Sequence, residues 1–364
     1  MKKTILITSV GSLVGQNILD SLKNRRQNLK IIGTNCIAEV ANNFRCDKIY
    51  MISKTEEIEN YIRELTRIIE NEQPDLVIPG RDSEVEILAK LAKIISGFEN
   101  RFLAGSEYFA HCMDDKVESY QFALKHNLPF APTVESGTPD SEINVQGLIA
   151  KFGFPLIAKP SKGNGSRGIW IVLNKIQLEK VIKEPDFAIQ PLFGQPSDLK
   201  LDTSFGIPLF WEIPESRLFA SQVVINKNGK IVSIFGFISK MVNGKCERMD
   251  RSDNPEMRKI VLRFAEAAVI EGWRGPFNVQ LKEDPTHGFQ VIEMNGRFSG
   301  GTSGRYYFGF DEVGMVLEDW IGKGVIPEKQ LPQDVNVVTK ILADYEIKQS
   351  NVDTLLREKI WEAS

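Results

Sequence analysis

The residues with the clearest capacity for chemistry lie in the stretch GPFNVQLKEDPTHGFQVIEMNGRFSGG, which begins at Gly275. Apolar, β-favouring residues alternate with polar ones on both sides of a turn at 284–288. This pattern predicts two strands, 277–282 and 289–294, joined as a hairpin.

Alternation also predicts which side chains share a face of this hairpin. Gln280 lies on one face of the first strand, and Glu293 and Asn295 share one face of the second. Three oxygen ligands with room for phosphate oxygens suit Mg²⁺, or Mn²⁺ in its place, better than zinc. Arg297 follows two residues after Asn295, where its guanidinium could bind the same phosphates. The polar face of an ordinary hairpin explains the stretch equally well.

The composition narrows the class of protein. The chain has 364 residues, 42% of them hydrophobic and 26% charged, with a formal net charge of −3, and such a length predicts about two or three domains. Lys and Arg form no dominant cluster, so nucleic acid is not an expected partner. No apolar run approaches the roughly 20 residues of a membrane span. Four cysteines without CxxC spacing indicate the reduced thiols of a cytoplasmic protein.

The first part of the chain alternates apolar runs with amphipathic helical patterns. The run at 4–10 precedes GSLVG, helical patterns follow at about 56–71 and 83–96, and the strands DLVIP and RFLAG come after them. This order predicts a parallel sheet with helices on both faces. The glycine spacing departs from the dinucleotide fingerprint, so NAD is not expected.

The segment Gly80-Arg81-Asp82-Ser83-Glu84 directly follows a buried strand of this sheet. Open α/β sheets bind ligands at the carboxyl ends of their strands, so Arg81, Asp82 and Glu84 could face a substrate. Capping of the next helix by Asp82 or Ser83, with Glu84 in its first turn, is an equally good interpretation.

A second informative stretch is PLIAKPSKGNGSRGIWIV, residues 155–172. The connection between its two apolar runs includes Lys162, Gly163, Asn164, Gly165 and Ser166. Small residues let backbone N–H groups approach phosphates, which favours a phosphate-binding loop over a plain hairpin. Lys159 lies within the first strand, where a half-buried charge needs a partner.

A domain boundary is expected near residue 112, before a capped helix that begins with DDK. Lys116 lies in the first turn of that helix, where the dipole favours acids. The lysine therefore suggests an anion beyond the helix, although a solvated lysine is the more ordinary case. An Asn-Gly turn at 227–230 predicts a further hairpin, and residues 255–271 form a clear helical pattern.

Together these segments resemble the ATP-grasp enzymes, and most closely the ATP-binding halves of the carbamoyl-phosphate synthase large chain, over roughly residues 1–325. The resemblance implies an α/β fold that becomes α+β toward the C-terminus. It implies a Rossmann-like pre-ATP-grasp domain at 1–111, a first ATP-grasp subdomain with a glycine-rich flap at 112–190, a second subdomain with the metal site at 191–325, and a C-terminal extension at 326–364.

The resemblance also implies roles for single residues. Lys159 matches the strand lysine that reaches nucleotide phosphates, and the loop from Lys162 to Ser166 matches the flap over them. Lys116 matches a basic residue that touches phosphate. The metal-ligand pattern and the phosphate-binding arginine of E-x-N-x-R correspond to Gln280, Glu293, Asn295 and Arg297.

Three further assignments concern the base, the ribose and the substrate. Gln190-Pro191-Leu192 stands where the family has Gln-Glu before apolar residues, and proline removes a carboxylate and an N–H, so adenine contacts rest on neighbouring main chain. Asp198 is the candidate ribose-binding acid. Arg305 is a candidate carboxylate clamp, with a surface arginine as the alternative.

The implied activity is that of an ATP-dependent carboxylate–amine ligase. ATP would phosphorylate a carboxylate and an amine would displace the phosphate, with Lys159 and Arg297 as the catalytic groups beside Mg²⁺. A small-molecule kinase would use the same MgATP site, and a nucleotide sensor would keep the lysines without needing the metal ligands. Expected partners are small-molecule carboxylate and amine substrates, and a homodimer is one assembly the sequence permits.

Overall fold

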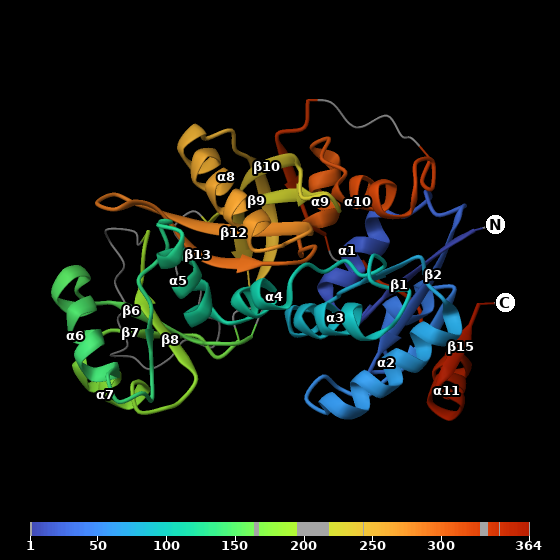
Figure 1. The fold of residues 1–364 in the computed structure, drawn as a ribbon, viewed down its shortest axis with the longest axis horizontal. Helices are drawn as coiled ribbons and strands as arrows, with labels where there is room; N and C mark the ends of the chain where they lie inside the picture. The colour runs from blue at the N-terminus through green and yellow to red at the C-terminus, as the bar shows by residue number, and fades with distance from the viewer. Residues whose placement is uncertain are drawn as a thin grey trace.

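The computed structural model describes residues 2–163, 167–194, 218–242, 244–327, 334–341 and 343–363. Three sheets organise this part of the chain (Figure 1). We call them the first sheet, the small sheet and the large sheet. The mixed α/β architecture predicted from the sequence is confirmed.

The first sheet has the strand order β15-β3-β2-β1-β4 and lies on the right in Figure 1. Strands β1 to β4 are parallel, and β15 joins the edge antiparallel. Its strands are β1 (Lys3–Ile7), β2 (Leu29–Asn35), β3 (Lys48–Met51), β4 (Leu76–Ile78) and β15 (Ile360–Glu362). The helical segments around it are α1 (Leu13–Ser21), η1 (Ala41–Arg45), α2 (Ile58–Glu72), α3 (Asp82–Ile94) and α11 (Gln349–Glu358).

Burial along β1 explains why its sequence is continuously apolar. Ile5 and Ile7 enter one hydrophobic cluster, and Leu6 enters another on the opposite face. The strand is therefore covered by helices on both sides, as a parallel sheet requires.

The predicted strand RFLAG is wrong. Phe102 forms only an isolated bridge with Val77. The chain then turns away, because Ser106 donates its backbone N–H to Gly272 at 3.1 Å and Gly105 packs against the backbone of Trp273.

The small sheet, on the left in Figure 1, has the antiparallel order β5-β8-β6-β7. Its strands are β5 (Val134–Glu135), β6 (Leu156–Pro160), β7 (Trp170–Val172) and β8 (Phe187–Pro191). Helices α6 (Ser141–Phe152) and α7 (Lys175–Val181) pack on the face that carries Leu156, Ala158 and Ile189. Lys159 directly follows Ala158 in the strand, so its side chain points to the opposite face of the sheet.

The large sheet is antiparallel, with the order β13-β12-β9-β10-β11-β14. Its strands are β9 (Leu218–Ile225), β10 (Ile231–Val242), β11 (Lys245–Arg251), β12 (Gly275–Asp284), β13 (Gly288–Asn295) and β14 (Val337–Thr339). Helix α8 (Pro255–Ile270) contacts β9 and β10. The remaining helices are α4 (Glu107–Asp114), α5 (Lys116–Lys125), α9 (Thr302–Tyr307) and α10 (Glu312–Ile321).

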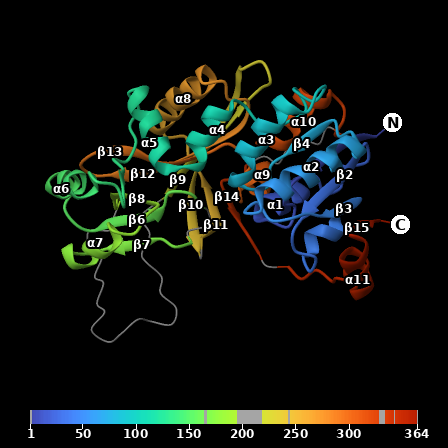
Figure 2. The ribbon, with the colours of Figure 1, turned by 60° about the horizontal axis from the view of Figure 1, so that its bottom comes forward.

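The C-terminal segment connects two of the sheets. Strand β14 extends the large sheet beside β11, and β15 extends the first sheet beside β3. Figure 2 shows the chain passing from one to the other before it forms α11. Because each strand completes a sheet edge, this segment belongs to the fold, a role that the sequence alone did not reveal.

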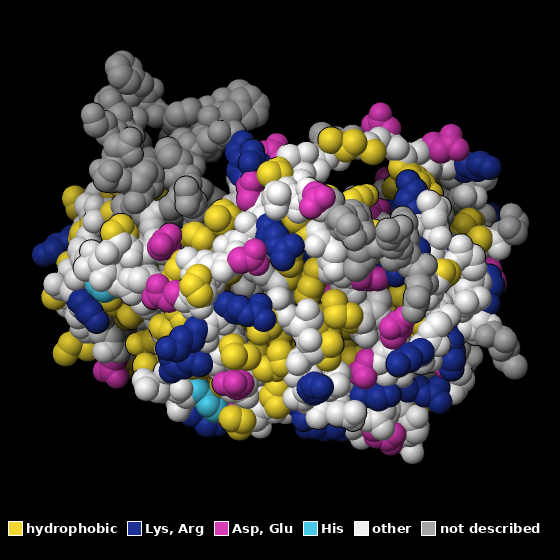
Figure 3. Space-filling model, turned by 90° about the horizontal axis from the view of Figure 1, so that it is seen from above, with side chains coloured by type: hydrophobic (Ala, Val, Ile, Leu, Met, Phe, Trp, Pro, Cys, Tyr) yellow, Lys and Arg dark blue, Asp and Glu magenta, His cyan; other side chains and the backbone are white. Residues whose placement is uncertain are grey.

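Surface and side-chain features agree with the composition. No helix in the described part of the chain is long and apolar enough to cross a bilayer. On the face drawn in Figure 3, Lys and Arg are interspersed with Asp and Glu. All four cysteines are free thiols, as their spacing predicted.

Candidate nucleotide and metal site

The predicted hairpin is present as β12 and β13, and its register sets the side chains that face one another. Gln280 pairs with Glu293, and Asn278 pairs with Asn295. The register shifts between Gln280 and Leu281, and such an irregularity increases the local twist. Gln280 and Glu293 remain partly exposed, whereas Asn295 is buried.

Lys159 on β6 faces this hairpin from the small sheet. Its side chain is buried, and no hydrogen bond or ion pair engages it among the described residues. Burial lowers the pKa of Lys159 to about 8, while the charge of Glu293 acts in the opposite direction. The small and large sheets therefore bring a cation and a carboxylate into electrostatic contact across the space between them.

Lys116, the first residue of α5, uses its charge differently. Its Nζ donates to the carbonyl oxygens of Pro160, Ser161 and Gly163 at 3.2, 3.4 and 3.3 Å. Its backbone N–H also donates to Ser161. The sequence suggested an anion beyond this helix, but here three carbonyl oxygens of the glycine-rich connection take that place.

The flap itself is only partly described. Lys162 lies 3.9 Å from the carboxylate of Asp114, measured from Nζ to Oδ2. Asn164, Gly165 and Ser166 lie outside the described residues. The candidate ribose acid, Asp198, also lies outside them.

Arg297 lies just beyond β13 at the junction with the first sheet. Its Nη2 is 2.5 Å from Asp82 Oδ2 and 3.2 Å from Asn295 Oδ1. Its Nη1 donates to the carbonyl oxygen of Phe298 at 3.1 Å. The Nε atom is buried and has no hydrogen-bond partner among the described residues. The Nε–H is therefore a buried donor that the described residues leave unpaired.

The expected adenine hinge is fixed by the small sheet. Gln190 is buried, and its Nε2 donates to Thr133 Oγ1 at 2.9 Å. Its Oε1 is buried without a partner in the described structure. Pro191 pairs with Leu156, and the N–H of Leu192 donates to Pro155 at 3.3 Å. The N–H of Leu192 is thus already occupied, whereas the Gln190 side-chain oxygen is not.

The structure does not support Glu84 as a substrate contact. Its carboxylate is 0% exposed. It accepts hydrogen bonds from five donors, namely Thr8 Oγ1, Ser9 Oγ, Tyr61 OH and the backbone N–H groups of Gly80 and Arg81. A carboxylate with this many internal donors has no capacity left for a ligand. Arg81 is the N-cap residue of α3 and stays partly exposed, so neither Asp82 nor Ser83 caps that helix.

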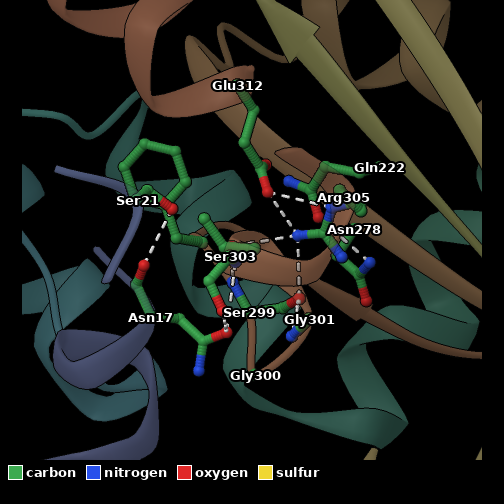
Figure 4. Close-up of polar contacts among 12 residues, drawn as sticks. Asn17, Ser21, Gln222, Asn278, Ser299, Gly300, Gly301, Ser303, Arg305 and Glu312 are labelled. Carbon is green, nitrogen blue, oxygen red and sulfur yellow. Dashed lines mark hydrogen bonds and ion pairs between the residues drawn. The ribbon is translucent and has the colours of Figure 1, made fainter. Parts of the chain in front are cut away.

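Arg305 is neither a surface arginine nor an open carboxylate clamp (Figure 4). It is 0% exposed, and its Nε and Nη2 donate to Glu312 Oε1 at 2.9 and 2.5 Å. Nη2 also reaches the hydroxyl groups of Ser299 and Thr302. An arginine enclosed by its own segment in this way stabilises the turn that follows the hairpin of β12 and β13, which we call the metal hairpin because it carries the candidate metal ligands.

Two sets of polar contacts between separate elements were not predicted from the sequence. The first is the Asp82–Arg297 pair, whose members are 215 residues apart in the chain. The second is centred on Asn17 of α1, whose Oδ1 accepts from Ser303 Oγ at 2.8 Å and from Lys340 Nζ at 3.1 Å (Figure 4 shows the Ser303 contact). No local pattern indicates such pairs, because each joins different elements of the fold.

The residues present suit a magnesium nucleotide. Two cations are available, namely the buried Lys159 and Arg297 with its unpaired Nε–H. Hard oxygen ligands come from the partly exposed carboxylate of Glu293 and the amide of Gln280 opposite it. No three His, Cys, Asp or Glu side chains in the described structure lie together as a metal cluster. A metal at this hairpin would therefore rely on one carboxylate and two amides.

Comparisons with known proteins agree with this architecture. The family model described as PylC-like, N-terminal domain matches residues 5–99. The carbamoyl phosphate synthase large chain of Pyrococcus furiosus is 24% identical over 304 residues, which is 78% of this chain and 26% of that protein. Chloroplastic biotin carboxylase 2 of Populus trichocarpa is 24% identical over 191 residues, which is 51% of this chain and 34% of that protein. The matches thus span about a quarter to a third of these relatives.

Solved structures are similar over most of the chain. N5-carboxyaminoimidazole synthetase from Staphylococcus aureus superposes with a TM-score of 0.65 at 13% identity, covering 98% of this chain and 86% of that one. The biotin carboxylase domain of Hydrogenobacter thermophilus 2-oxoglutarate carboxylase, solved with MgADP, ADP and bicarbonate, gives a TM-score of 0.64 at 16% identity, covering 92% and 72%.

The chain therefore has the ATP-grasp fold. Within that class its sequence resembles the carbamoyl phosphate synthase large chain and biotin carboxylase.

Proposed function

We propose that this protein is an ATP-dependent carboxylate–amine ligase that works through an acyl phosphate and releases ADP and inorganic phosphate. The observation that carries the proposal is Lys159, a buried cation without a described partner that faces Glu293 on the metal hairpin. A buried unpaired charge is costly unless a ligand of opposite charge completes it. The similarity to a biotin carboxylase domain solved with MgADP and bicarbonate supports a nucleotide and a small carboxylate as those ligands.

In this proposal the two sheets hold opposite sides of the nucleotide. Lys159 contacts phosphate oxygens from the small sheet, and Lys116 positions the start of the glycine-rich flap through its carbonyl contacts. Gln280, Glu293 and Asn295 would hold Mg²⁺, which would supply charge neutralisation at the phosphates. Arg297 offers its unpaired Nε–H to the transferred phosphoryl group.

The chemistry divides into two balanced steps. A carboxylate oxygen of the substrate attacks the γ-phosphorus, and the bond from that phosphorus to the bridging oxygen breaks and releases ADP. The amine then attacks the acyl carbon, the acyl carbon–oxygen bond breaks, and inorganic phosphate leaves as the amine nitrogen loses a proton. Lys159 and Arg297 act by stabilising negative charge in the transfer and by holding the anions in line.

The domain organisation follows the same proposal. Residues 1–111 form the pre-ATP-grasp domain, 112–190 the first ATP-grasp subdomain, 191–325 the second, and 326–364 the C-terminal extension. Adenine would lie against Gln190, Pro191 and Leu192, with the Gln190 Oε1 atom as an available acceptor. Asp198 would contact the ribose.

The test begins with the substrate. Purified protein is incubated with MgATP, single amino acids or sugar acids, and ammonia or an amine, and ADP release is followed. The active carboxylate is then supplied with ¹⁸O in its carboxyl group. The proposal expects one labelled oxygen in inorganic phosphate, because that oxygen bridges to phosphorus before the acyl–oxygen bond breaks. A stable phosphorylated product without labelled phosphate would show a kinase, and AMP with pyrophosphate would exclude the acyl-phosphate route.

A further inference from the structure

Asp82 lies where the first sheet is expected to meet a ligand. It is the first residue of α3, directly after the carboxyl end of β4. Strands β2 and β3 are added on one side of β1 and β4 on the other, so the order in which strands are added reverses between β1 and β4. Parallel sheets bind ligands outside the strand ends at such a reversal.

Glu84 fixes the backbone that carries Asp82. The Glu84 carboxylate binds Thr8 and Ser9 after β1, Tyr61 of α2, and the backbone N–H groups of Gly80 and Arg81. Gly80 packs so tightly that a Cβ there would lie 2.1 Å from the Thr8 carbonyl oxygen. The start of α3 is therefore held to the ends of β1 and β4, and Asp82 projects from a rigid base.

Arg297 depends on Asp82 for its orientation. Asp82 Oδ2 lies 2.5 Å from Arg297 Nη2, and the two side chains are 10% and 11% exposed. The weaker partners, Asn295 Oδ1 at 3.2 Å and the Phe298 carbonyl at 3.1 Å, both belong to the segment of Arg297 itself. Only Asp82 ties the guanidinium to another part of the molecule among the described residues, and it leaves Nε unused.

We propose that Asp82 is a positioning residue that holds the Arg297 guanidinium beside the metal hairpin with its Nε–H free for the transferred phosphoryl group. This inference rests on the proposed function, because it assigns that N–H to a phosphate oxygen. Asp82 follows β4 and is held to the end of β1, so through Asp82 the first sheet would contribute to the ATP site as well as to any substrate site.

The chain offers a matched control for this contact. Arg25, which follows α1, is 2.5 Å from Asp311, the N-cap residue of α10, measured from Nη2 to Oδ2, and their side chains are 8% and 16% exposed. This pair also joins segments distant in sequence and is similarly buried. It has no contact with the metal hairpin in the described structure.

The experiment measures binding of MgATP, magnesium AMP-PNP and MgADP by calorimetry. The proteins compared are wild type, Asp82→Ala, Asp82→Asn, Arg297→Gln, the Asp82→Ala/Arg297→Gln double variant and the control Asp311→Asn. We expect Asp82→Ala to weaken AMP-PNP binding about tenfold, because a misplaced guanidinium loses its charge-assisted hydrogen bond. MgADP affinity should change less than about twofold, since the terminal phosphate is absent. Asp82→Asn keeps the size and one acceptor oxygen, so it should fall between wild type and Asp82→Ala.

The double variant decides whether the two residues act together. It should bind AMP-PNP within about twofold of Arg297→Gln alone, because a positioning residue has no effect once its target is gone. Asp311→Asn should lower the thermal midpoint and leave all three affinities unchanged. Full AMP-PNP affinity in Asp82→Ala, or losses that multiply in the double variant, would overturn the inference while leaving the ligase proposal standing. Absence of MgATP binding by the wild type would instead overturn the proposed function, and this inference with it.

Discussion

Two arginines follow the same strand, and the structure uses them in opposite ways. Arg305 is enclosed with Glu312, and both side chains are 0% exposed. Arg297 reaches Asp82 on a different element and is 11% exposed. Each arginine keeps one buried nitrogen without a described partner, Nη1 in Arg305 and Nε in Arg297. An unpaired buried N–H therefore does not by itself identify a ligand site. The informative difference is that Arg297 lies beside Asn295 of the metal hairpin, whereas Arg305 is enclosed by its own segment.

The two buried lysines near the flap also differ, in this case in their hydrogen-bond partners. Lys116 gives its Nζ to three carbonyl oxygens. Lys159 has no such partner among the described residues, and its lowered pKa reflects that burial. We therefore interpret Lys116 and Arg305 as structural cations, and Lys159 and Arg297 as cations kept for a ligand.

The largest expected effect is on stability, at Arg305. Arg305→Met should reduce the free energy of unfolding by about 3–5 kcal/mol, because Glu312 is left buried without its cation. Urea denaturation measures this loss. The double variant Arg305→Met/Glu312→Gln is the control and should recover part of it, since the buried charge is removed as well. A single variant as stable as wild type would contradict the structural interpretation of Arg305.

The next effect is on turnover, at the metal hairpin. Glu293→Gln should lower the rate of ADP release about 100- to 1000-fold, because an amide replaces the only carboxylate of the expected metal set. Its unfolding midpoint should stay close to that of wild type, since Glu293 is partly exposed. Steady-state kinetics at saturating Mg²⁺ and Mn²⁺ test the assignment. Near-normal turnover in a folded variant would remove Glu293 from the site.

A smaller effect distinguishes the two lysines directly. Lys159→Met should weaken MgATP binding about 10- to 100-fold, because a cation is lost from a desolvated phosphate contact. Lys116→Met should instead increase amide hydrogen exchange at residues 161–163, because the lysine binds the carbonyl groups of Pro160, Ser161 and Gly163. Calorimetry and hydrogen exchange on both variants make the comparison. If Lys159→Met binds MgATP normally, the two lysines do not differ as we describe.

The smallest effect is a pH dependence set by Lys159. Its pKa is lowered from 10.5 to about 8 by burial, so the charged form that binds phosphate becomes scarcer as pH rises above 8. MgATP affinity should fall by up to about tenfold per pH unit there. Lys159→Arg stays protonated and should give a flat profile over the same range. Calorimetry in two buffers with different ionisation enthalpies should show proton uptake only in the wild type.

The lowered pKa of Lys159 also predicts how the stability of the ligand-free protein changes with pH. Below pH 8 Lys159 is charged in both the folded and unfolded states, so the cost of burying the charge is fully present. Between pH 8 and 10.5 the unfolded chain binds more protons than the folded chain, and this contribution to stability rises with pH. A ligand-free protein that gains stability over this range would support the same assignment independently of activity.

Several elements could be predicted because their causes are local. The hairpin of β12 and β13, the parallel first sheet and helix α8 depend on periodicity and capping within short windows, and these predictions are confirmed. The strand expected at RFLAG failed because a tertiary contact of Ser106 with Gly272 draws the chain away from the sheet. For Glu84 the structure agrees with the interpretation that places it in the first turn of α3, and Arg305 is buried instead of being a clamp or a surface residue. Burial decided both outcomes, and it depends on how the elements pack together.

The sequence by itself determined which side chains carry chemistry and which of them share a face. It grouped Glu293 with Asn295 on one face of a strand and placed Lys159 within a half-buried strand, because strand alternation is a property of the backbone. The pairing of Gln280 with Glu293 and the face of β6 that carries Lys159 come from the structure. The tertiary structure decided which cations are already satisfied. Lys116 meets carbonyl groups about 45 residues away, and Arg297 meets Asp82 across 215 residues. Such pairings depend on how separate sheets pack, and no short-range pattern encodes that arrangement.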